Sequence, residues 1–237
     1  MRLTRQPACI LHVRPWRETS LLLECLSRDH GRMGLVARGA RSSRGRLVRA
    51  LLEPFQDLEI DCSGQGELLT LTRAEPVAQA RWLAGDALYS GLYVNELVVR
   101  MLARHDPYPG LLARYQEVLD GLACGEDMAW ILRRFERDLL ATLGYALELR
   151  HEGDSGEALE PDRTYVYVPE LGPIAWHGQE GLRLHGEDLL SLAADRRPPD
   201  SSMPRLRMLM RHLIRWHGNT GELRAWRVLA RPGSGRS

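Results

Sequence analysis

Up to Pro76, short apolar segments alternate with turn signals, and this pattern restricts the N-terminal part of the chain to a small all-β fold. The "RDHG" turn joins two of these segments into a predicted hairpin, and "SGQG" marks a second turn. A helical pattern is absent here apart from one turn near residues 47–52. Five strands joined by turns favour a closed β-barrel, of which the oligonucleotide-binding (OB) barrel is one architecture. The predicted strands lie at residues 8–13, 19–27, 31–39, 55–62 and 67–76.

Beyond Pro76 the apolar residues recur at helical spacing, so the second part of the chain is predicted to be mainly α-helical. "DPYPG" at 106–110 separates the first two predicted helices. A short hairpin at 164–176, with "ELGP" as its turn, interrupts the helices and follows an acidic loop at 151–162. The predicted helices lie at 80–103, around 115–122, 130–143, 186–195, 204–216 and 221–230, before a frayed tail at 231–237.

The expected fold class is therefore α+β, with an OB-type barrel over residues 1–79 and a helical domain over 80–237. The helical domain carries a small β-hairpin insertion at about 150–178. The length of 237 residues is sufficient for a substantial core. No apolar run approaches a membrane span, and the N-terminus does not resemble a secretory signal, so we expect a cytoplasmic protein.

Three common catalytic motifs are absent from the sequence. The chain lacks a phosphate-binding GxxxxGK[ST] loop, a GxSxG elbow and an HExxH zinc motif. Its four cysteines are widely separated and predict buried free thiols rather than disulfides or a metal site. The adjacent acids Glu187 and Asp188 are typical of the first turn of a helix. We expect no enzymatic activity and no cofactor.

An acid-free, arginine-rich segment between Asp29 and Glu53 is the strongest functional signal. The whole chain has a formal charge of +1 and contains no lysine, so this local excess of arginine is uncompensated. Several guanidinium groups on a Gly- and Ser-containing connection suit the phosphates of a nucleic acid. We predict that these arginines contact phosphates: Arg38, Arg41, Arg44 and Arg46, with Arg49 as a weaker member. The alternative is a solvated loop.

A second acid-free region lies between Asp200 and Glu222. Arg207, Arg211 and Arg215 follow i,i+4 spacing and would share one helical face, whose partner could be DNA, an acidic protein tail or water. Aromatic platforms for base stacking are scarce, because Phe55 and Phe135 fit core positions. Trp16 and Trp82 are the exceptions. Because stacking platforms are scarce, we expect little preference for particular base sequences.

Three long segments resemble the RecO family of bacterial recombination-mediator and DNA-repair proteins. "LHVRPWRETSLLLECLSRDHGRMGLVARGARSSRGRLVRALLEPFQDLEI" is similar to the N-terminal barrel of that family. "LYSGLYVNELVVRML" and "LRRFERDLLATLGYALEL" are similar to its two signature helices. The resemblance weakens after these helices and returns faintly at "LRAWRVLAR", where relatives often carry a "KSR"-like basic stretch.

The resemblance implies functions that the residue pattern alone does not give. RecO-like proteins bind single- and double-stranded DNA, anneal complementary strands and, with the partner RecR, help load RecA onto DNA coated by single-strand-binding protein (SSB). They contact the acidic C-terminal tail of SSB, for which Arg133 in the helical domain is our candidate. An intrahelical pair between Arg133 and Glu136 is the competing interpretation. Many relatives hold zinc with four cysteines, whereas residues 144–176 contain none, so the insertion is expected to lack zinc ligands.

A different function class remains open. The chain could be a non-enzymatic protein-interaction scaffold whose basic loop docks acidic partners rather than DNA. Salt-dependent binding of an oligonucleotide of random sequence separates the two hypotheses, because only the first predicts it.

Overall fold

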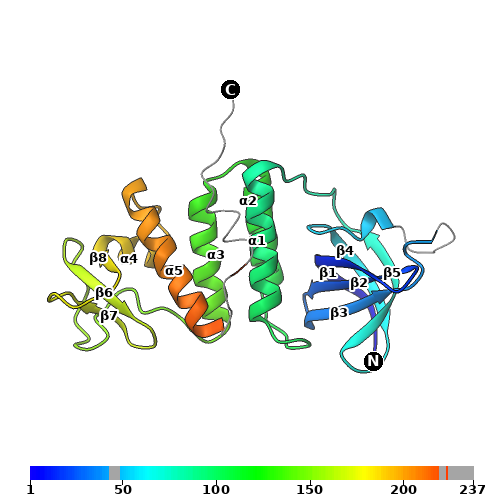
Figure 1. Cartoon of the computed structure of the whole chain (residues 1–237), viewed down its shortest axis with the longest axis horizontal. Helices are drawn as coiled ribbons and strands as arrows, with labels where there is room; N and C mark the ends of the chain where they lie inside the picture. Colours follow the sequence, from blue (N-terminus) through cyan, green and yellow to red (C-terminus); the bar gives the residue numbers. More distant parts are fainter. Residues whose placement is uncertain (43–48, 219–222, 224–237) are drawn as a thin grey trace. The chain divides into compact units, whose positions relative to one another are not determined.

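The computed structural model describes residues 1–42, 49–218 and 223, and its chain divides into two compact units. Of the described residues, the first unit contains those up to 126 together with residue 223, and the second contains residues 127–218 (Figure 1). The first compact unit thus includes the two helices at 85–101 and 111–124 together with the N-terminal strands. The predicted division at residue 79 instead follows the change from strands to helices. No described helix is long and apolar enough to cross a membrane.

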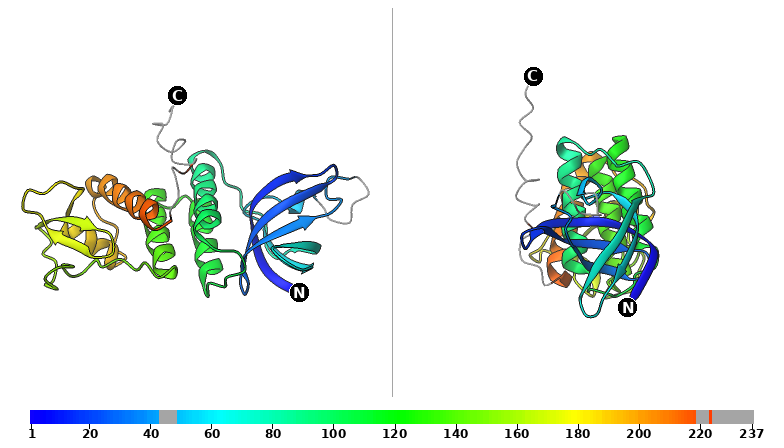
Figure 2. Two further views of the ribbon diagram at one scale, coloured as in Figure 1. Left: turned by 60° about the horizontal axis from the view of Figure 1, so that its bottom comes forward. Right: turned by 90° about the vertical axis from the view of Figure 1, so that its right-hand side faces the viewer.

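The N-terminal strands form a closed barrel in the order β1-β2-β3-β5-β4, which confirms the predicted OB-type architecture (Figures 1 and 2). All neighbouring pairs are antiparallel except β3 and β5, which run parallel. The strands are β1 (Arg2–Trp16), β2 (Ser20–Ser27), β3 (Gly31–Ala37), β4 (Asp57–Ser63) and β5 (Leu68–Pro76). A short 3-10 helix, η1 (Arg49–Leu51), lies at the predicted turn between β3 and β4.

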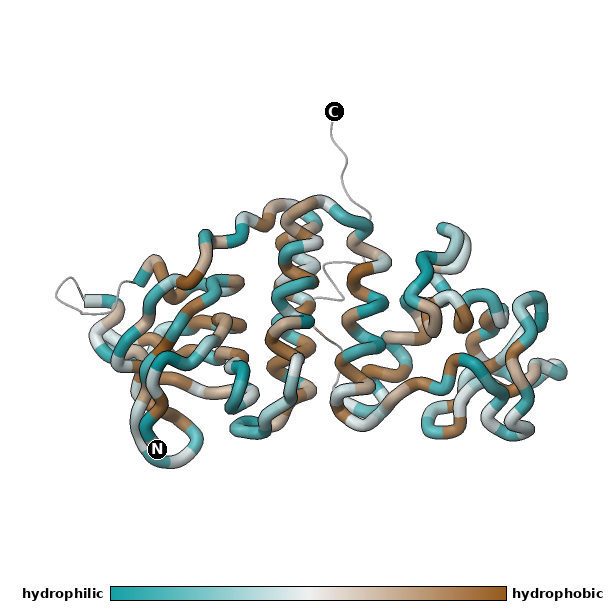
Figure 3. Tube along the Cα trace, turned by 180° about the vertical axis from the view of Figure 1, so that it is seen from behind, coloured by the Kyte–Doolittle hydropathy of each residue, from teal (hydrophilic) through white to brown (hydrophobic). Residues whose placement is uncertain are grey.

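The strand pleat explains why this sequence closes into a barrel. Alternate residues of β2 and β3 point inward and pack in one buried core. Hydrophobic residues are frequent along the strands of the barrel, as the hydropathy colouring of Figure 3 shows. The inward set includes Leu21, Leu23, Cys25, Met33 and Leu35, each at most 1% exposed. The residues between them lie on the outer face. Part of this face is also buried, at Cys9 and Leu11 of β1 and at Leu22 and Leu26 of β2.

Two helices of the first unit, α1 (Gly85–Met101) and α2 (Leu111–Cys124), pack against each other and against the outer barrel face. Asn95 on α1 donates to the backbone oxygen of Leu11 in β1 at 2.8 Å. The Tyr115 hydroxyl on α2 donates to Asn95 at 2.6 Å, and all three residues are buried. This hydrogen-bond chain fixes both helices on the barrel, because each buried polar group has a partner.

The second unit packs helices against a small sheet. Its helices are α3 (Met128–Thr142), α4 (Gly186–Ala193) and α5 (Met203–Gly218), with a 3-10 turn η2 (Asp200–Ser202). The predicted hairpin is present as β6 (Thr164–Val168) and β7 (Gly172–Ala175), and a further strand, β8 (Arg183–His185), pairs with the other edge of β6. Glu187 and Asp188 occupy the first turn of α4, as predicted. The predicted helix at 221–230 lies outside the described residues, apart from the single residue 223.

The cysteine-free insertion is held by an ion pair and short turns. Glu152 was expected on an exposed acidic loop but is 6% exposed, because Arg163 donates to its carboxylate at 3.0 Å and Ser155 at 2.8 Å. The backbone of Glu152 also donates to the oxygen of Glu157 at 2.7 Å. Within the described ranges, no three His, Cys, Asp or Glu side chains cluster closely enough to hold a metal ion.

Candidate nucleic-acid interface

Two connections meet at one end of the barrel. The β1–β2 turn occupies residues 17–19, and the chain leaves β3 at Arg38 on the same end because neighbouring strands alternate in direction. The backbone N–H of Arg41 donates to the oxygen of Thr19 at 2.9 Å. The Arg41 guanidinium contacts the backbone oxygen of Arg17 at 3.4 Å. These contacts hold the start of the arginine-rich segment against the turn.

Buried side chains anchor the arginine-rich segment to the barrel on both sides. Ala40 is 4% exposed and Leu52 is fully buried, and both belong to the barrel core. Gly39 has φ +69°, a left-handed conformation that glycine adopts without strain, and the N–H of Ser42 donates to its oxygen at 2.9 Å. The described parts of the connection are therefore fixed to the barrel, which places Arg38 and Arg41 at this end.

The predicted arginines have different surroundings. Arg38 and Arg41 are exposed, and no carboxylate in the described parts of the chain pairs with either. Arg49 is exposed and lies 3.9 Å from Glu53, both side chains being more than half exposed. Such a surface pair contributes little free energy and can exchange for a phosphate. Arg44 and Arg46 lie outside the described residues.

Two further arginines share this end and were not among the predicted set. Arg14 near the end of β1 and Arg17 in the β1–β2 turn are both exposed, and neither has a carboxylate partner in the described residues. The sequence could have predicted their position. In three consecutive antiparallel strands, the turn between the first two strands and the end of the third strand lie at the same end of the sheet. We call Arg14, Arg17, Arg38, Arg41 and Arg49 the cationic barrel end.

Arg32, which also belongs to the acid-free segment, is structural. It is directed to the outer barrel face, where its guanidinium lies 3.4 Å from Glu24 and is 17% exposed. Arg104, just after α1, also pairs with Glu24 and contacts Glu67 at 3.3 Å. Burial lowers the pKa of Arg32, although the nearby charge of Glu24 acts to raise it. This cluster ties the barrel to the end of α1 and is not available to a ligand.

The aromatic residues agree only in part with the predicted scarcity of stacking platforms. Besides Trp82, four further aromatic side chains are exposed: Tyr89, Tyr145, Trp176 and Trp216. Phe55 and Phe135 are core residues, at 7% and 2% exposure. Trp82 is 87% exposed in the linker that follows β5, and Trp16 is partly exposed at the end of β1. Trp82 follows Arg81, whose guanidinium contacts the backbone oxygen of Phe55 at 3.4 Å.

The candidate partner-binding arginines separate into two groups. Arg133 on α3 is 4% exposed and its guanidinium donates to the fully buried Glu136 at 2.7 Å, so the intrahelical pair is the arrangement that the structure has. Arg207 and Arg215 on α5 are exposed and Arg211 is half-buried between them, in line with their predicted common face. The exposed Met208 and Trp216 lie beside them, at 55% and 57% exposure.

The buried titratable groups near the barrel serve packing. Burial raises the pKa of the Cys9 and Cys25 thiols far above their ordinary value, so both stay protonated. Burial also raises the pKa of Tyr115, whose hydroxyl lies in the α1–barrel hydrogen-bond chain. Neither thiol has the accessible, electropositive surroundings of a nucleophile.

These features define a class: proteins that combine an N-terminal OB-type barrel, cationic at one end, with a helical C-terminal part. Comparison with known proteins identifies the family. The model described as "Recombination protein O N terminal" matches residues 1–80, and "Recombination protein O C terminal" matches residues 83–199. The chain belongs to the RecO family of DNA repair and recombination proteins.

Curated relatives named DNA repair protein RecO extend over nearly the full chain. The protein of Aromatoleum aromaticum is 44% identical over 230 residues, which cover 96% of this chain and 95% of the relative. That of Ralstonia nicotianae is 43% identical, covering 91% of this chain and 80% of the relative. The Methylococcus capsulatus protein is 43% identical, with 92% and 89% covered.

Proposed function

We propose that the protein is a non-catalytic recombination mediator whose cationic barrel end binds the phosphates of DNA. It binds single- and double-stranded DNA and anneals complementary strands. With RecR it helps load RecA onto SSB-coated DNA. The observation that carries the proposal is a set of exposed arginines on one end of an OB-type barrel. Four of them have no carboxylate partner among the described residues: Arg14, Arg17, Arg38 and Arg41. Such a protein acts in the cytoplasm, at the nucleoid.

Annealing follows from contacts to phosphates rather than to bases. A guanidinium that binds phosphate neutralises the repulsion between two strands and leaves the base edges free to pair. In the barrel, Phe55 is buried and Trp16 is only partly exposed, which supports a sequence-independent mode. If about four phosphates are neutralised, the logarithm of the affinity for a single strand falls with the logarithm of salt concentration at a slope near −3.

Fluorescence polarisation with a labelled oligonucleotide of random sequence tests this proposal. The variant Arg41→Glu/Arg44→Glu should bind at least about tenfold more weakly, because two phosphate contacts become repulsions. Arg2→Glu/Arg28→Glu is the matched control, since both residues are exposed and belong to the other end of the barrel. Wild-type affinity in the first variant, with its thermal stability intact, overturns the assignment. Salt-insensitive or absent binding by the wild type favours the scaffold hypothesis instead.

For the SSB tail, an acidic peptide with an apolar end, we propose the exposed face of α5. Arg207, Arg211 and Arg215 would pair with its carboxylates, and Met208 with Trp216 offers apolar area for its last residues. Arg133 is the poorer candidate because its charge is buried against Glu136. Pull-down of SSB with and without its last residues, using Arg207→Glu/Arg215→Glu and the control Arg183→Glu/Arg196→Glu, tests this assignment.

A further inference from the structure

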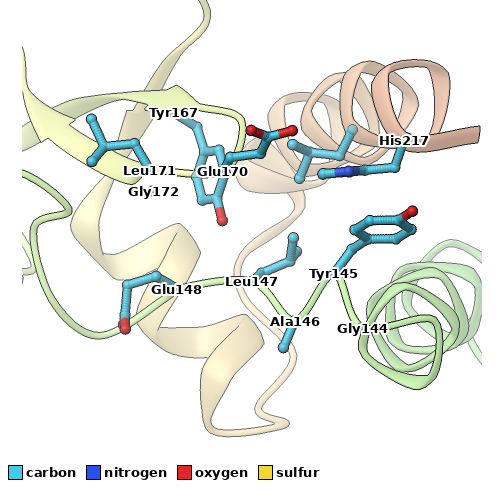
Figure 4. A pocket seen from close by; sticks show the side chains of 11 residues that line it. Gly144, Tyr145, Ala146, Leu147, Glu148, Tyr167, Glu170, Leu171, Gly172 and His217 are labelled. Carbon is cyan, nitrogen blue, oxygen red and sulfur yellow. The ribbon is translucent and has the colours of Figure 1, made fainter.

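The second unit contains a cavity of about 250 Å³, whose lining residues take no part in the proposed DNA contact or the proposed SSB-tail contact (Figure 4). Its walls come from three segments: residues 144–148 after α3, the β6–β7 turn with the end of β6, and the last turns of α5. The volume is slightly below that of drug-sized sites, which run from about 300 Å³ upward. The cavity therefore suits one long side chain rather than a cofactor.

Aromatic rings form one side of this cavity. Tyr145 and His217 stack with their ring centroids 4.2 Å apart and their planes 22° from parallel. Tyr167 is 8% exposed, and Figure 4 shows its hydroxyl directed toward the enclosed space. Leu147 and Leu213 supply apolar contacts. Flat rings with aliphatic neighbours bind planar groups and apolar stems.

The charged groups of the cavity wall make it anionic. Glu148 and Glu170 are its two carboxylates, and no arginine is among its lining residues. Hydrogen bonds from backbone N–H groups lower the pKa of Glu148, and that from Arg150 contributes most. Glu148 therefore stays ionised at neutral pH. Burial lowers the pKa of His217, and the nearby charge of Glu170 offsets only part of this effect. The imidazole is therefore neutral at pH 7. The cavity thus repels phosphates and acidic peptides.

The backbone places Glu170 at the rim at some conformational cost. This residue has φ +68°, a left-handed conformation that a residue with a Cβ rarely adopts. Its carboxylate accepts from the indole N–H of Trp216 at 3.4 Å, which is a long hydrogen bond. A stronger donor can replace that contact.

We propose that this cavity binds the side chain of an arginine presented by a partner polypeptide. The guanidinium stacks on the rings of Tyr145 and Tyr167 and donates two parallel hydrogen bonds to the carboxylate of Glu170. The aliphatic part of the arginine side chain contacts Leu147 and Leu213. The site goes beyond the proposed DNA and SSB-tail contacts, since both of those ligands are anionic. It takes a partner of the opposite charge.

The test uses the full chain and two neutral-backbone probes of nearly equal shape. N-acetyl-arginine amide carries the guanidinium, and N-acetyl-citrulline amide replaces it with an uncharged urea group. Two-dimensional ¹H–¹⁵N spectra resolve the indole signals of the six tryptophans, and Trp216→Phe assigns the one at the rim. The arginine probe should shift the Trp216 signal in a saturable way, because it competes for Glu170.

The expected result is at least about tenfold weaker binding by the citrulline probe, the loss typical of one charge-assisted hydrogen bond. Glu170→Gln should weaken the arginine probe by a similar factor, whereas the control Glu180→Gln, also exposed and outside the cavity wall, should not. Equal binding of both probes overturns the proposal, as does an unmoved Trp216 signal. Loss of DNA binding in Arg41→Glu/Arg44→Glu does not alter these outcomes, so the two proposals fail separately.

Discussion

Arg81 and Asp57 form an ion pair of 2.6 Å in which the side chains are 12% and 7% exposed. Arg81 lies in the linker after β5, and Asp57 begins β4. The same guanidinium contacts Asp120 on α2 at 2.5 Å, and Gln116 donates to Asp57 at 3.0 Å. One arginine thus joins the linker, the barrel and α2 within the first unit.

Replacing Arg81 with alanine should strongly destabilise the first unit. It leaves the Asp57 carboxylate buried with only a neutral donor, a change that costs about 3 kcal/mol in the free energy of unfolding. Urea denaturation measures this loss. The double variant Asp57→Asn/Arg81→Ala should recover much of it, because no buried charge remains.

The control for this pair is Arg114→Ala. Arg114 pairs with Glu117 at 3.0 Å, but both side chains are more than half exposed. Its loss should change the free energy of unfolding by less than about 1 kcal/mol. A similar small effect in Arg81→Ala would show that the linker pair does not stabilise the unit.

Asp57 also illustrates what the sequence can and cannot predict. The alternation of apolar residues gives β4 correctly, but Asp57 breaks the pattern and its partner lies far along the chain. Arg133 presents the same difficulty, since an arginine three residues before a glutamate fits either an exposed pair or a buried one. Burial depends on what packs over the helix, which local spacing does not contain.

The position of the candidate arginines on the barrel was more predictable than these pairs, because it depends on topology. Arg38 and Arg41 follow a strand whose hairpin neighbour is evident from the sequence, and their excess charge is local. Arg14 and Arg17 could have been added by following strand direction alone. The third strand at 183–185 was missed, because three residues are too few to show an alternating pattern.

The Asp188–Arg205 pair should make the stability of the second unit depend on pH. Burial acts to raise the pKa of Asp188, but hydrogen bonds from Arg205, Ser202 and the backbone of His185 outweigh it and lower the value. A lowered pKa in the folded state gives stability that is present above the unfolded value, about 4, and is lost as pH falls through the folded value. Asp188→Asn should thus cost about 1–2 kcal/mol at pH 7.

That cost should shrink as the pH falls from about 4 toward the lowered folded value, because the carboxylate of the unfolded chain is protonated first. Urea denaturation at several pH values between 7 and 3 measures the difference. Asp162→Asn serves as the control, since Asp162 is an exposed aspartate of the same unit. A difference that stays constant over this range would contradict the assigned ion pair.

The cysteine-free insertion should depend on Glu152 rather than on a metal. Glu152→Gln removes the charge that pairs with Arg163 at 3.0 Å and should cost about 1–2 kcal/mol. Limited proteolysis should then cut residues 151–162 faster than in the wild type. Treatment with a chelator should leave the thermal unfolding midpoint of the wild type unchanged, and a lower midpoint would reveal a metal.

The β1–β2 turn should contribute to DNA binding as the arginine-rich segment does. Each phosphate contact to a single strand adds about −0.7 to the slope of log affinity against log salt concentration. Arg14→Gln/Arg17→Gln should therefore make this slope less negative by about 1.4. Neutral replacements keep the turn intact, because the Arg41 contact is to the backbone oxygen of Arg17. Arg2→Gln/Arg28→Gln, at the other end of the barrel, should leave the slope unchanged. An unchanged slope in the turn variant would restrict the interface to the connection after β3.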